Sequence, residues 1–250
     1  MKQIFNFLTL LLAVALLAGC KNEEPDFTKN IAEHFDEKFA IYLEEEGHIV
    51  NAKKFTIADV KDIEVLYMLN LRILENGQFS TYDLTSLAGI EYLTALKTLN
   101  CGSYRITSLD VSKNTALTYL DCMSNQLIAL DVSKNTALTE LYCGGNQLTV
   151  LDISKNTALR KLECTHNQFT TLDISNNTAL EHLYCSSNQL SALNISNNTS
   201  LKELYCLQNP GNGTAFPVTA WFDNNSIPHK FTAEGWDFDG SRIDIEYIKK

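Results

Sequence analysis

Six cysteines recur through the middle of this 250-residue chain at one fixed spacing. They lie 21 residues apart every time, at Cys101, Cys122, Cys143, Cys164, Cys185 and Cys206. Thiols in such a series could bind a metal ion, form disulfides between neighbouring units, or pack as small apolar side chains. A fixed period of about 20 to 50 residues is typical of repeat proteins. The architecture of the repeat therefore has to decide among the three roles.

The segments that carry the cysteines are predicted to be short strands. One unit, Leu117-Thr-Tyr-Leu120-Asp-Cys122-Met-Ser-Asn125-Gln-Leu127, returns with small changes from Leu138, Leu159, Leu180 and Leu201. Its apolar residues alternate with polar ones around the cysteine, and this period of two is typical of a β-strand. Stacked units would form parallel strands about 4.8 Å apart. The side chains expected to point into the core of one coil are Leu117, Leu120, Cys122, Leu127, Leu130, Val132 and Ala137.

This geometry favours packing as the role of the six cysteines. Equivalent Cβ atoms on neighbouring strands would lie roughly 4.8 Å apart, beyond the ~3.5–4.5 Å that a disulfide prefers. A one-dimensional stack of thiols also provides no tetrahedral ligand cluster and no charged groups around it to orient metal ligands. We therefore expect six buried free thiols, no metal site and no cofactor.

The unit follows the pattern L-x-x-L-x-L-x-x-N-x-L of leucine-rich repeats, with Cys in the third apolar place. On the phrases Asp-Val-Ser-Lys-Asn-Thr-Ala-Leu and Cys-x-x-Asn-Gln-Leu, residues 96–209 resemble the cysteine-containing repeats of internalin-J-like surface proteins and of Bacteroidota lipoproteins. The resemblance implies a surface-exposed binding scaffold, often with a role in adhesion, and no catalytic residue. The expected fold is an α/β solenoid with a parallel β-sheet on its concave face. Short turns or 3-10 segments are expected on its convex face.

One asparagine follows each cysteine at a fixed distance and is predicted to be structural. Where the backbone turns inward after the strand, its N–H and C=O groups need partners, and an amide side chain can both donate and accept. The column consists of Asn125, Asn146, Asn167, Asn188 and Asn209. The Ser-Lys-Asn-Thr segments on the far side are expected to form turns.

Both ends of such a stack expose apolar cross-sections and need caps. Residues 28–62 are expected to form a helical N-terminal cap, with a capping box in which Thr56 precedes Asp59 by three residues. Degenerate first repeats are expected over residues 63–95. Residues 210–250 are expected to form a β C-terminal cap, in which Asp239-Gly240 is typical of a hairpin turn.

Residues 1–19 have the pattern of a signal peptide, with Lys2 before an apolar segment too short to span a bilayer comfortably. The sequence Leu17-Ala18-Gly19-Cys20 resembles a bacterial lipobox, which implies a lipid on Cys20 and an acylated tether over residues 20–27. An ordinary cleaved signal with a chance cysteine is the alternative.

The residues that follow Cys20 bear on where such a lipoprotein would reside. Lys21-Asn22-Glu23-Glu24 resembles the signal that exports Bacteroidota lipoproteins to the outer cell surface, although a merely acidic tether is an equally good interpretation. The resemblance implies an outer-membrane lipoprotein that faces the cell exterior and contacts the membrane through Cys20.

The variable positions of the repeat identify a candidate ligand-binding face. Side chains on either side of the strand leucine point to solvent, and their types change from unit to unit while the rest of the repeat is nearly fixed. The candidate ligand-binding residues are Tyr119, Asp121, Glu140, Tyr142, Lys161, Glu163, His182, Tyr184, Glu203 and Tyr205. Tyrosine is a common interface anchor, although strands also favour it for its own sake.

These observations favour a cell-surface protein that binds a protein or a glycan through its strands. The formal net charge of −10 argues against nucleic acid as the partner. A non-catalytic accessory or structural subunit of a surface nutrient-uptake assembly is the alternative. Catalysis is not expected, because His166 and His182 come without a nucleophile-elbow, zinc or paired-carboxylate motif.

Overall fold

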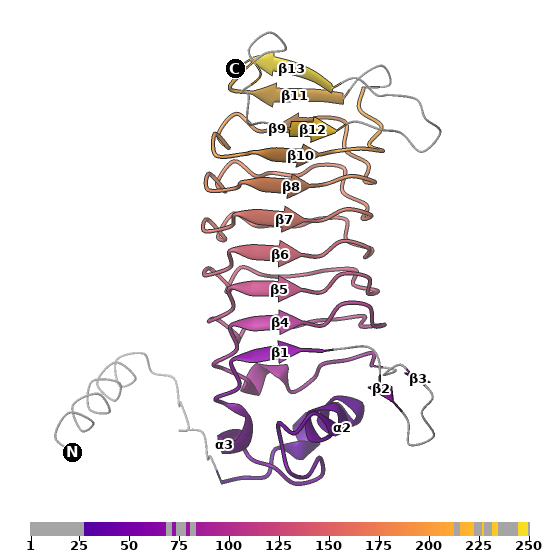
Figure 1. Cartoon of the computed structure of the whole chain (residues 1–250), viewed down its shortest axis with the longest axis vertical. Helices are drawn as coiled ribbons and strands as arrows, with labels where there is room; N and C mark the ends of the chain where they lie inside the picture. Colours follow the sequence, from indigo (N-terminus) through magenta and orange to yellow (C-terminus); the bar gives the residue numbers. More distant parts are fainter. Residues whose placement is uncertain are drawn as a thin grey trace, which may run out of the picture.

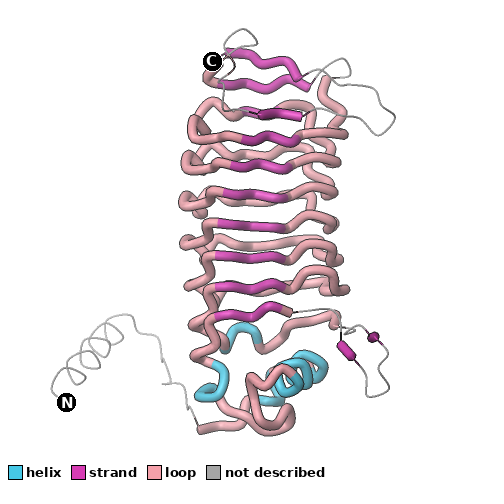
Figure 2. Tube along the Cα trace, viewed as in Figure 1, coloured by secondary structure: helices cyan, strands magenta, loops and turns pink. Residues whose placement is uncertain are grey.

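The computed structural model of the chain describes residues 28–68, 72–73, 79–80, 84–212, 216–222, 227, 232–234 and 245–249. Its main body is an elongated stack of coils in which short strands lie one above another (Figure 1). Loops and turns complete each coil around the strands (Figure 2). The predicted leucine-rich repeat solenoid with a parallel sheet is therefore confirmed.

Eight strands form one continuous parallel sheet along the stack. In spatial order they are β1 (Val65–Tyr67), β4 (Thr98–Asn100), β5 (Tyr119–Asp121), β6 (Glu140–Tyr142), β7 (Lys161–Glu163), β8 (His182–Tyr184), β10 (Glu203–Tyr205) and β12 (Thr232–Glu234). Between β4 and β10 the register follows the repeat, so that Leu120 lies opposite Leu141, 21 residues further on. Each 21-residue repeat therefore forms one coil of the stack.

Each strand from β4 to β10 buries its central leucine and leaves the two flanking residues half-buried. The cysteine that follows the strand is buried as well, and the leucine and cysteine columns belong to one continuous apolar core. Side chains that alternate between two faces of a strand explain this pattern, because only one face of the sheet meets the core.

The expectation that Ala137 points into the core is wrong, because its side chain is exposed. Asn135 from the same turn is fully buried instead. Its amide donates hydrogen bonds to the carbonyls of Val111 and Asn114 in the preceding coil, both at 2.9 Å. A tight turn leaves backbone carbonyls without partners inside the coil, and Asn135 supplies two donors where alanine has none.

The same arrangement recurs through the stack. We call its members the turn asparagines: Asn114, Asn135, Asn156, Asn177 and Asn198. On the other side of the coil, the asparagines predicted from the Cys-x-x-Asn step are also buried. Asn125, for example, donates to the Cys101 carbonyl at 2.9 Å and accepts from the Ile106 amide at 3.0 Å. Two asparagine columns therefore satisfy the backbone at both bends of the coil.

Within the repeats, turns rather than helices lead into the strands, and the helices among the described residues lie before the first full repeat. These are η1 (Ala32–His34), α2 (Glu37–Glu45), α3 (Ile57–Val60) and η2 (Ile90–Tyr92). Asp36 is the N-cap of α2. Its carboxylate accepts hydrogen bonds from the backbone amides of Lys38 and Phe39 at 3.0 and 3.1 Å.

The N-terminal helices join the apolar core of the solenoid. Helix α2 buries Phe39, Tyr42 and Leu43, and the Tyr42 hydroxyl donates to the Tyr67 carbonyl of β1 at 3.2 Å. At the start of α3 the Thr56 amide donates to the Asp59 carboxylate at 2.7 Å, as the capping-box pattern predicts. Cys20 and the expected signal peptide lie outside the described residues, and no described helix is both long and apolar enough to cross a membrane.

The described strands on either side of Asp239-Gly240 do not pair with each other as the predicted hairpin requires, and Asp239-Gly240 itself lies outside the described residues. Strand β12 pairs in parallel with β10 in the main sheet, whereas β13 (Ile245–Lys249) pairs in parallel with β11 (Phe216–Ala220). Strand β9 (Leu193–Asn194) completes a second, three-stranded sheet with β11 and β13. The final strands continue the stacking of the coils, and each bonds to the coil beside it rather than to its neighbour in sequence. A short antiparallel pair, β2 (Arg72–Ile73) and β3 (Phe79–Ser80), precedes the repeats.

Candidate ligand-binding face

The in-register sheet brings the outward strand residues into two columns, which together we call the strand face. The first column contains Thr98, Tyr119, Glu140, Lys161, His182 and Glu203, and the second contains Asn100, Asp121, Tyr142, Glu163, Tyr184 and Tyr205. All ten sequence-predicted binding residues lie in these columns, and all are half-buried. His166 does not, because it is in the bend after β7 with a left-handed φ of 51°.

The tyrosines of the strand face form two groups. Tyr119 and Tyr142 have ring centroids 5.3 Å apart, with Tyr67 of β1 a further 6.4 Å from Tyr119. Tyr184 and Tyr205 stack on each other with centroids 5.0 Å apart and planes 23° from parallel. Strand β7, which carries Lys161 and Glu163, lies between the two groups.

Lys161 bridges the two tyrosine groups. Its ammonium nitrogen lies over the ring of Tyr142, 5.1 Å from the centroid, and over the ring of Tyr184 at 5.5 Å. Both distances fall within the roughly 6 Å range of cation–π attraction. We call Tyr142, Lys161 and Tyr184 the lysine clamp.

Glutamates orient the two clamp tyrosines. The Tyr142 hydroxyl donates to Glu140 Oε2 at 2.6 Å, and the Tyr184 hydroxyl donates to Glu203 Oε2, also at 2.6 Å. Burial, together with the neighbouring glutamate, raises the pKa of Tyr142 above its usual range and that of Tyr184 to about 12. Both phenols therefore remain protonated hydrogen-bond donors at neutral pH.

Glu203 also lies 3.0 Å from Nδ1 of His182. The hydrogen bonds from Tyr184 and His182 lower the pKa of Glu203. Glu203 of β10 therefore links to two side chains of β8, His182 and Tyr184, across the strand face.

A third row of side chains borders the strand face, one residue before each strand. Glu181 accepts a hydrogen bond from Arg160 Nε at 2.8 Å and also forms ion pairs with Arg160 and Lys202. These bonds, from Lys202 first and then Arg160, lower the pKa of Glu181 to about 2. The residues of this row were not among the predicted binding residues. Its signal was available, because the position reads Lys97, Thr118, Thr139, Arg160, Glu181 and Lys202 within a nearly fixed repeat.

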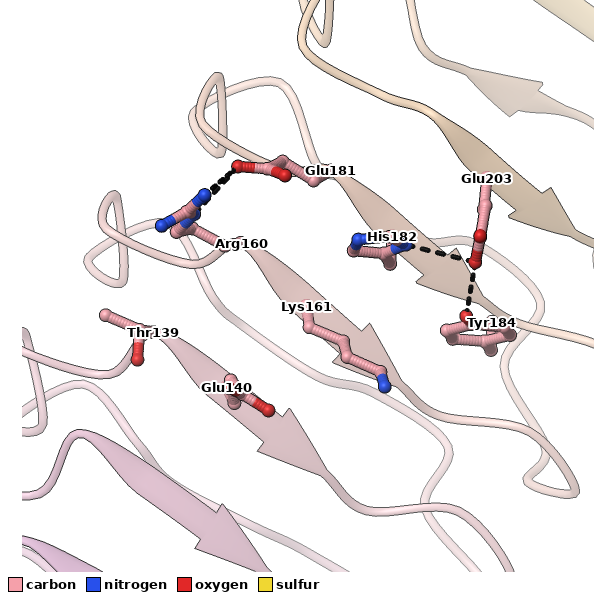
Figure 3. A pocket seen from close by; sticks show the side chains of 8 residues that line it. All are labelled: Thr139, Glu140, Arg160, Lys161, Glu181, His182, Tyr184 and Glu203. Atoms are coloured by element: carbon pink, nitrogen blue, oxygen red, sulfur yellow. Dashed lines mark hydrogen bonds and ion pairs between the residues drawn. The ribbon is translucent and has the colours of Figure 1, made fainter. Parts of the chain in front are cut away.

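Side chains of the strand face and of this third row line one hollow of about 410 Å³ (Figure 3). Its lining consists of Thr139, Glu140, Arg160, Lys161, Glu181, His182, Tyr184 and Glu203. Five of these eight residues were predicted from sequence as ligand-binding residues; Thr139, Arg160 and Glu181 were not. The hollow combines cations, carboxylates and an aromatic ring, so it can hydrogen-bond a polar ligand group.

Glu163 lies between the clamp tyrosines in the second column and packs over Gly144. Its Oε1 accepts from the Thr165 amide at 3.1 Å. A Cβ atom at position 144 would overlap the Glu163 carboxylate. Glycine at this position therefore makes room for the acid of the next coil.

The structure places the six ladder cysteines in the core as free thiols. Burial raises the pKa of each thiol, to about 12 for Cys206. A thiol with a raised pKa is a poor nucleophile, since the thiolate is the reactive form. No group of three His, Cys, Asp or Glu residues within the described parts of the chain could hold a metal ion.

No family model matches the sequence, and no curated protein matches it significantly. Solved structures do. Internalin InlF from Listeria monocytogenes has a TM-score of 0.58 at 19% identity, over 88% of this chain and 69% of that one. Internalin C2 from the same organism has a TM-score of 0.57 at 19% identity, over 85% and 99% of the two chains.

A third similar structure is the functional domain of InlJ from Listeria monocytogenes, which includes a cysteine ladder. It is 25% identical with a TM-score of 0.34, and the match covers 84% of this chain but 62% of the InlJ domain. This chain therefore spans less than two thirds of that domain.

The fold is that of the internalin leucine-rich repeat domains. The chain therefore has a leucine-rich repeat fold similar to that of these internalins, and a column of six buried cysteines runs through its core.

Proposed function

We propose that the protein is a cell-surface binding protein that recognises a protein or a glycan through its strand face. The leucine-rich repeat fold is commonly used for protein binding and recognition. The observation that carries the proposal is the contrast within each repeat. Core and turn positions are nearly identical from coil to coil, whereas the twelve strand-face residues vary and gather on one surface.

We propose a non-catalytic role for the same surface. His182 and Glu203 form its acid–base pair, and their side chains are 31% and 37% exposed. A reaction site usually excludes water so that electrostatic interactions become strong. A histidine and a carboxylate that are one third exposed on a sheet surface are better suited to hydrogen-bonding a partner.

The proposed location is the outer membrane, with the chain held by a lipid on Cys20 and facing the cell exterior. The lipobox-like sequence before Cys20 supports this, and two acyl chains are sufficient for stable anchoring. We expect Cys20→Ser to abolish incorporation of a labelled fatty acid and to release the protein from membranes. Extracellular protease should digest the wild-type protein on intact cells, and protection from the protease would contradict the outward orientation.

The binding role is tested by applying the full chain in detergent to arrays of proteins and glycans. Tyr142→Ala combined with Tyr184→Ala should abolish binding to every hit, because the pair removes both rings of the lysine clamp. A matched control is Ile128→Ala with Val150→Ala, since these large side chains are 68% and 72% exposed outside the strand face. Binding that survives the tyrosine pair would refute the strand face as the binding surface.

A further inference from the structure

We infer that the lysine clamp takes up a carboxylate from a partner protein, so that the strand face recognises an acidic peptide segment. This inference rests on the proposed binding function and adds the chemistry of the partner. Three features of the hollow support it: the pairing of its charges, the use of its aromatic rings, and its size.

Lys161 is the cation of the hollow that makes no direct ion pair, although its charge helps to lower the pKa of the nearby Glu203. Among the side chains that the structure describes, no carboxylate oxygen lies within 4.0 Å of its ammonium nitrogen. The other cation that lines the hollow, Arg160, is paired with Glu181. A lysine ammonium carries three donors, and contacts with two ring faces leave hydrogen bonds to be made.

The carboxylates of the hollow are already engaged by donors of the chain itself. Glu181 binds two cations, Glu203 binds Tyr184 and His182, and Glu140 binds Tyr142. An incoming cation would have to compete with these donors and would also meet Lys161. An incoming carboxylate would instead complete the hydrogen bonds of a half-buried ammonium, and charge-assisted bonds of this kind are the strong ones.

The aromatic rings favour a protein over a glycan. Sugar rings usually bind to an open aromatic face, but Tyr184 stacks on Tyr205 and is also covered by the Lys161 ammonium. Tyr142 is likewise in contact with Tyr119 and with Lys161. The rings of both clamp tyrosines are therefore already in contact with side chains of the protein itself. A partner would therefore meet the cation that lies between the two rings.

The hollow is large enough to admit an acidic side chain. At about 410 Å³ it lies in the lower part of the ~300–1,000 Å³ range of ligand pockets. Figure 3 shows Lys161 extending between the strand of Glu140 and the strand of His182 and Tyr184. A Glu or Asp side chain that enters the hollow would reach Lys161 while its flanking residues lie along the sheet.

The experiment uses an array of synthetic 12-residue peptides in matched sets that differ only at the central residue, which is Glu, Gln or Lys. The full chain in detergent is the probe. We expect the bound peptides to prefer central Glu over both counterparts by about tenfold or more, equivalent to ~1.4 kcal/mol. Neutral and uronate glycans on the same array test the other source of a carboxylate.

Variants identify the group responsible. Lys161→Met keeps the apolar stem over the tyrosines but removes the charge, so the preference for central Glu should disappear. Lys161→Arg should retain part of it. Lys155→Met is the matched control, because it removes the same charge from an exposed turn lysine and should change nothing. Unfolding midpoints of all variants should stay close to that of the wild type.

The inference is overturned if Lys161→Met strengthens binding, if the three peptide sets bind equally, or if uronate glycans bind in preference to peptides. It is also overturned if no peptide binds. The protein array described above then tests separately whether the strand face is a binding surface. Peptide binding that is insensitive to charge but lost in the Tyr142/Tyr184 double variant would leave the strand face intact. Binding unaffected by that double variant would remove the strand face as well.

Discussion

The turn asparagines and the strand face belong to the same coils, yet one is uniform and the other varied. Each turn asparagine meets the same backbone carbonyls of the coil before it, as Asn135 and Asn156 do. Strand-face residues contact mainly one another, through rings, carboxylates and a lysine. A side chain that hydrogen-bonds to the backbone must be the same in every coil, because the backbone geometry repeats. A side chain on the surface is not constrained in this way and can vary.

The largest expected effect is the loss of a turn asparagine. The Asn177 amide donates to the carbonyls of Ile153 and Asn156 at 3.0 and 2.9 Å inside the core. Asn177→Ala leaves both carbonyls unsatisfied, and we expect the free energy of unfolding to fall by about 2–4 kcal/mol in urea titrations. Asn176→Ala changes the exposed neighbour in the same turn and should stay within about 0.5 kcal/mol of wild type. Equal effects of the two variants would contradict the contrast.

The cysteine column is expected to respond next. Cys164→Ser places a hydroxyl in a fully buried apolar position, and we expect a loss of about 1–3 kcal/mol in the free energy of unfolding. Cys164→Ala should cost less, because it leaves only a small cavity. The six native thiols should also react slowly with a thiol reagent until the protein is unfolded. Rapid labelling, or disulfide formation in the folded state, would show that the column is not a packing device.

A smaller effect is expected where the core ends and the strand face begins. Gly144→Ala would push the Glu163 carboxylate out of its position, and a side chain held off its preferred rotamer costs about 0.5–1.5 kcal/mol. Glu163→Ala should relieve most of that cost, so a double-mutant cycle over the two positions should give a clear coupling energy. Additive effects would mean that the glutamate does not rest on the glycine.

The smallest expected effect is electrostatic. The Glu181 pKa is lowered from 4.5 to about 2 by Lys202 and Arg160. A lowered folded-state pKa contributes stability above the unfolded pKa, and that contribution is lost as the pH falls from about 4.5 towards 2. Glu181→Gln should therefore lower the stability slightly at neutral pH, flatten its loss between about pH 4.5 and 2, and match the wild type near pH 2. An unchanged acid profile would indicate that solvent screens the ion pairs completely.

The strand face was largely predictable because register is a property of the repeat. A period of two around Leu120 and Cys122 assigns the outward positions, and in-register stacking aligns them without further information. The third row with Arg160 and Glu181 escaped, because it lies one residue outside the strand pattern and reaches the hollow through long side chains. The lysine clamp could not be predicted either, since it depends on side-chain rotamers from three strands.

Errors in the sequence analysis arose where local patterns compete with stacking. Ala137 fits the apolar pattern. The side chain that points inward is nevertheless that of Asn135, because buried backbone carbonyls of the preceding coil need hydrogen-bond donors. Asp239-Gly240 is a good hairpin turn locally, yet β12 and β13 found parallel partners in separate sheets. In both places hydrogen bonds to an adjacent coil prevailed over the preference of the segment itself.

The sequence by itself determined the repeat, its 21-residue period, the parallel sheet and the identity of the outward columns, because each follows from periodicity and in-register stacking. Only the tertiary structure decided which side chains satisfy the turns, how the two terminal regions join the stack, and how Lys161 is held between Tyr142 and Tyr184. The physical reason is that a repeating pattern specifies positions along one axis. Contacts between coils depend on distances and rotamers that arise only when the coils are stacked.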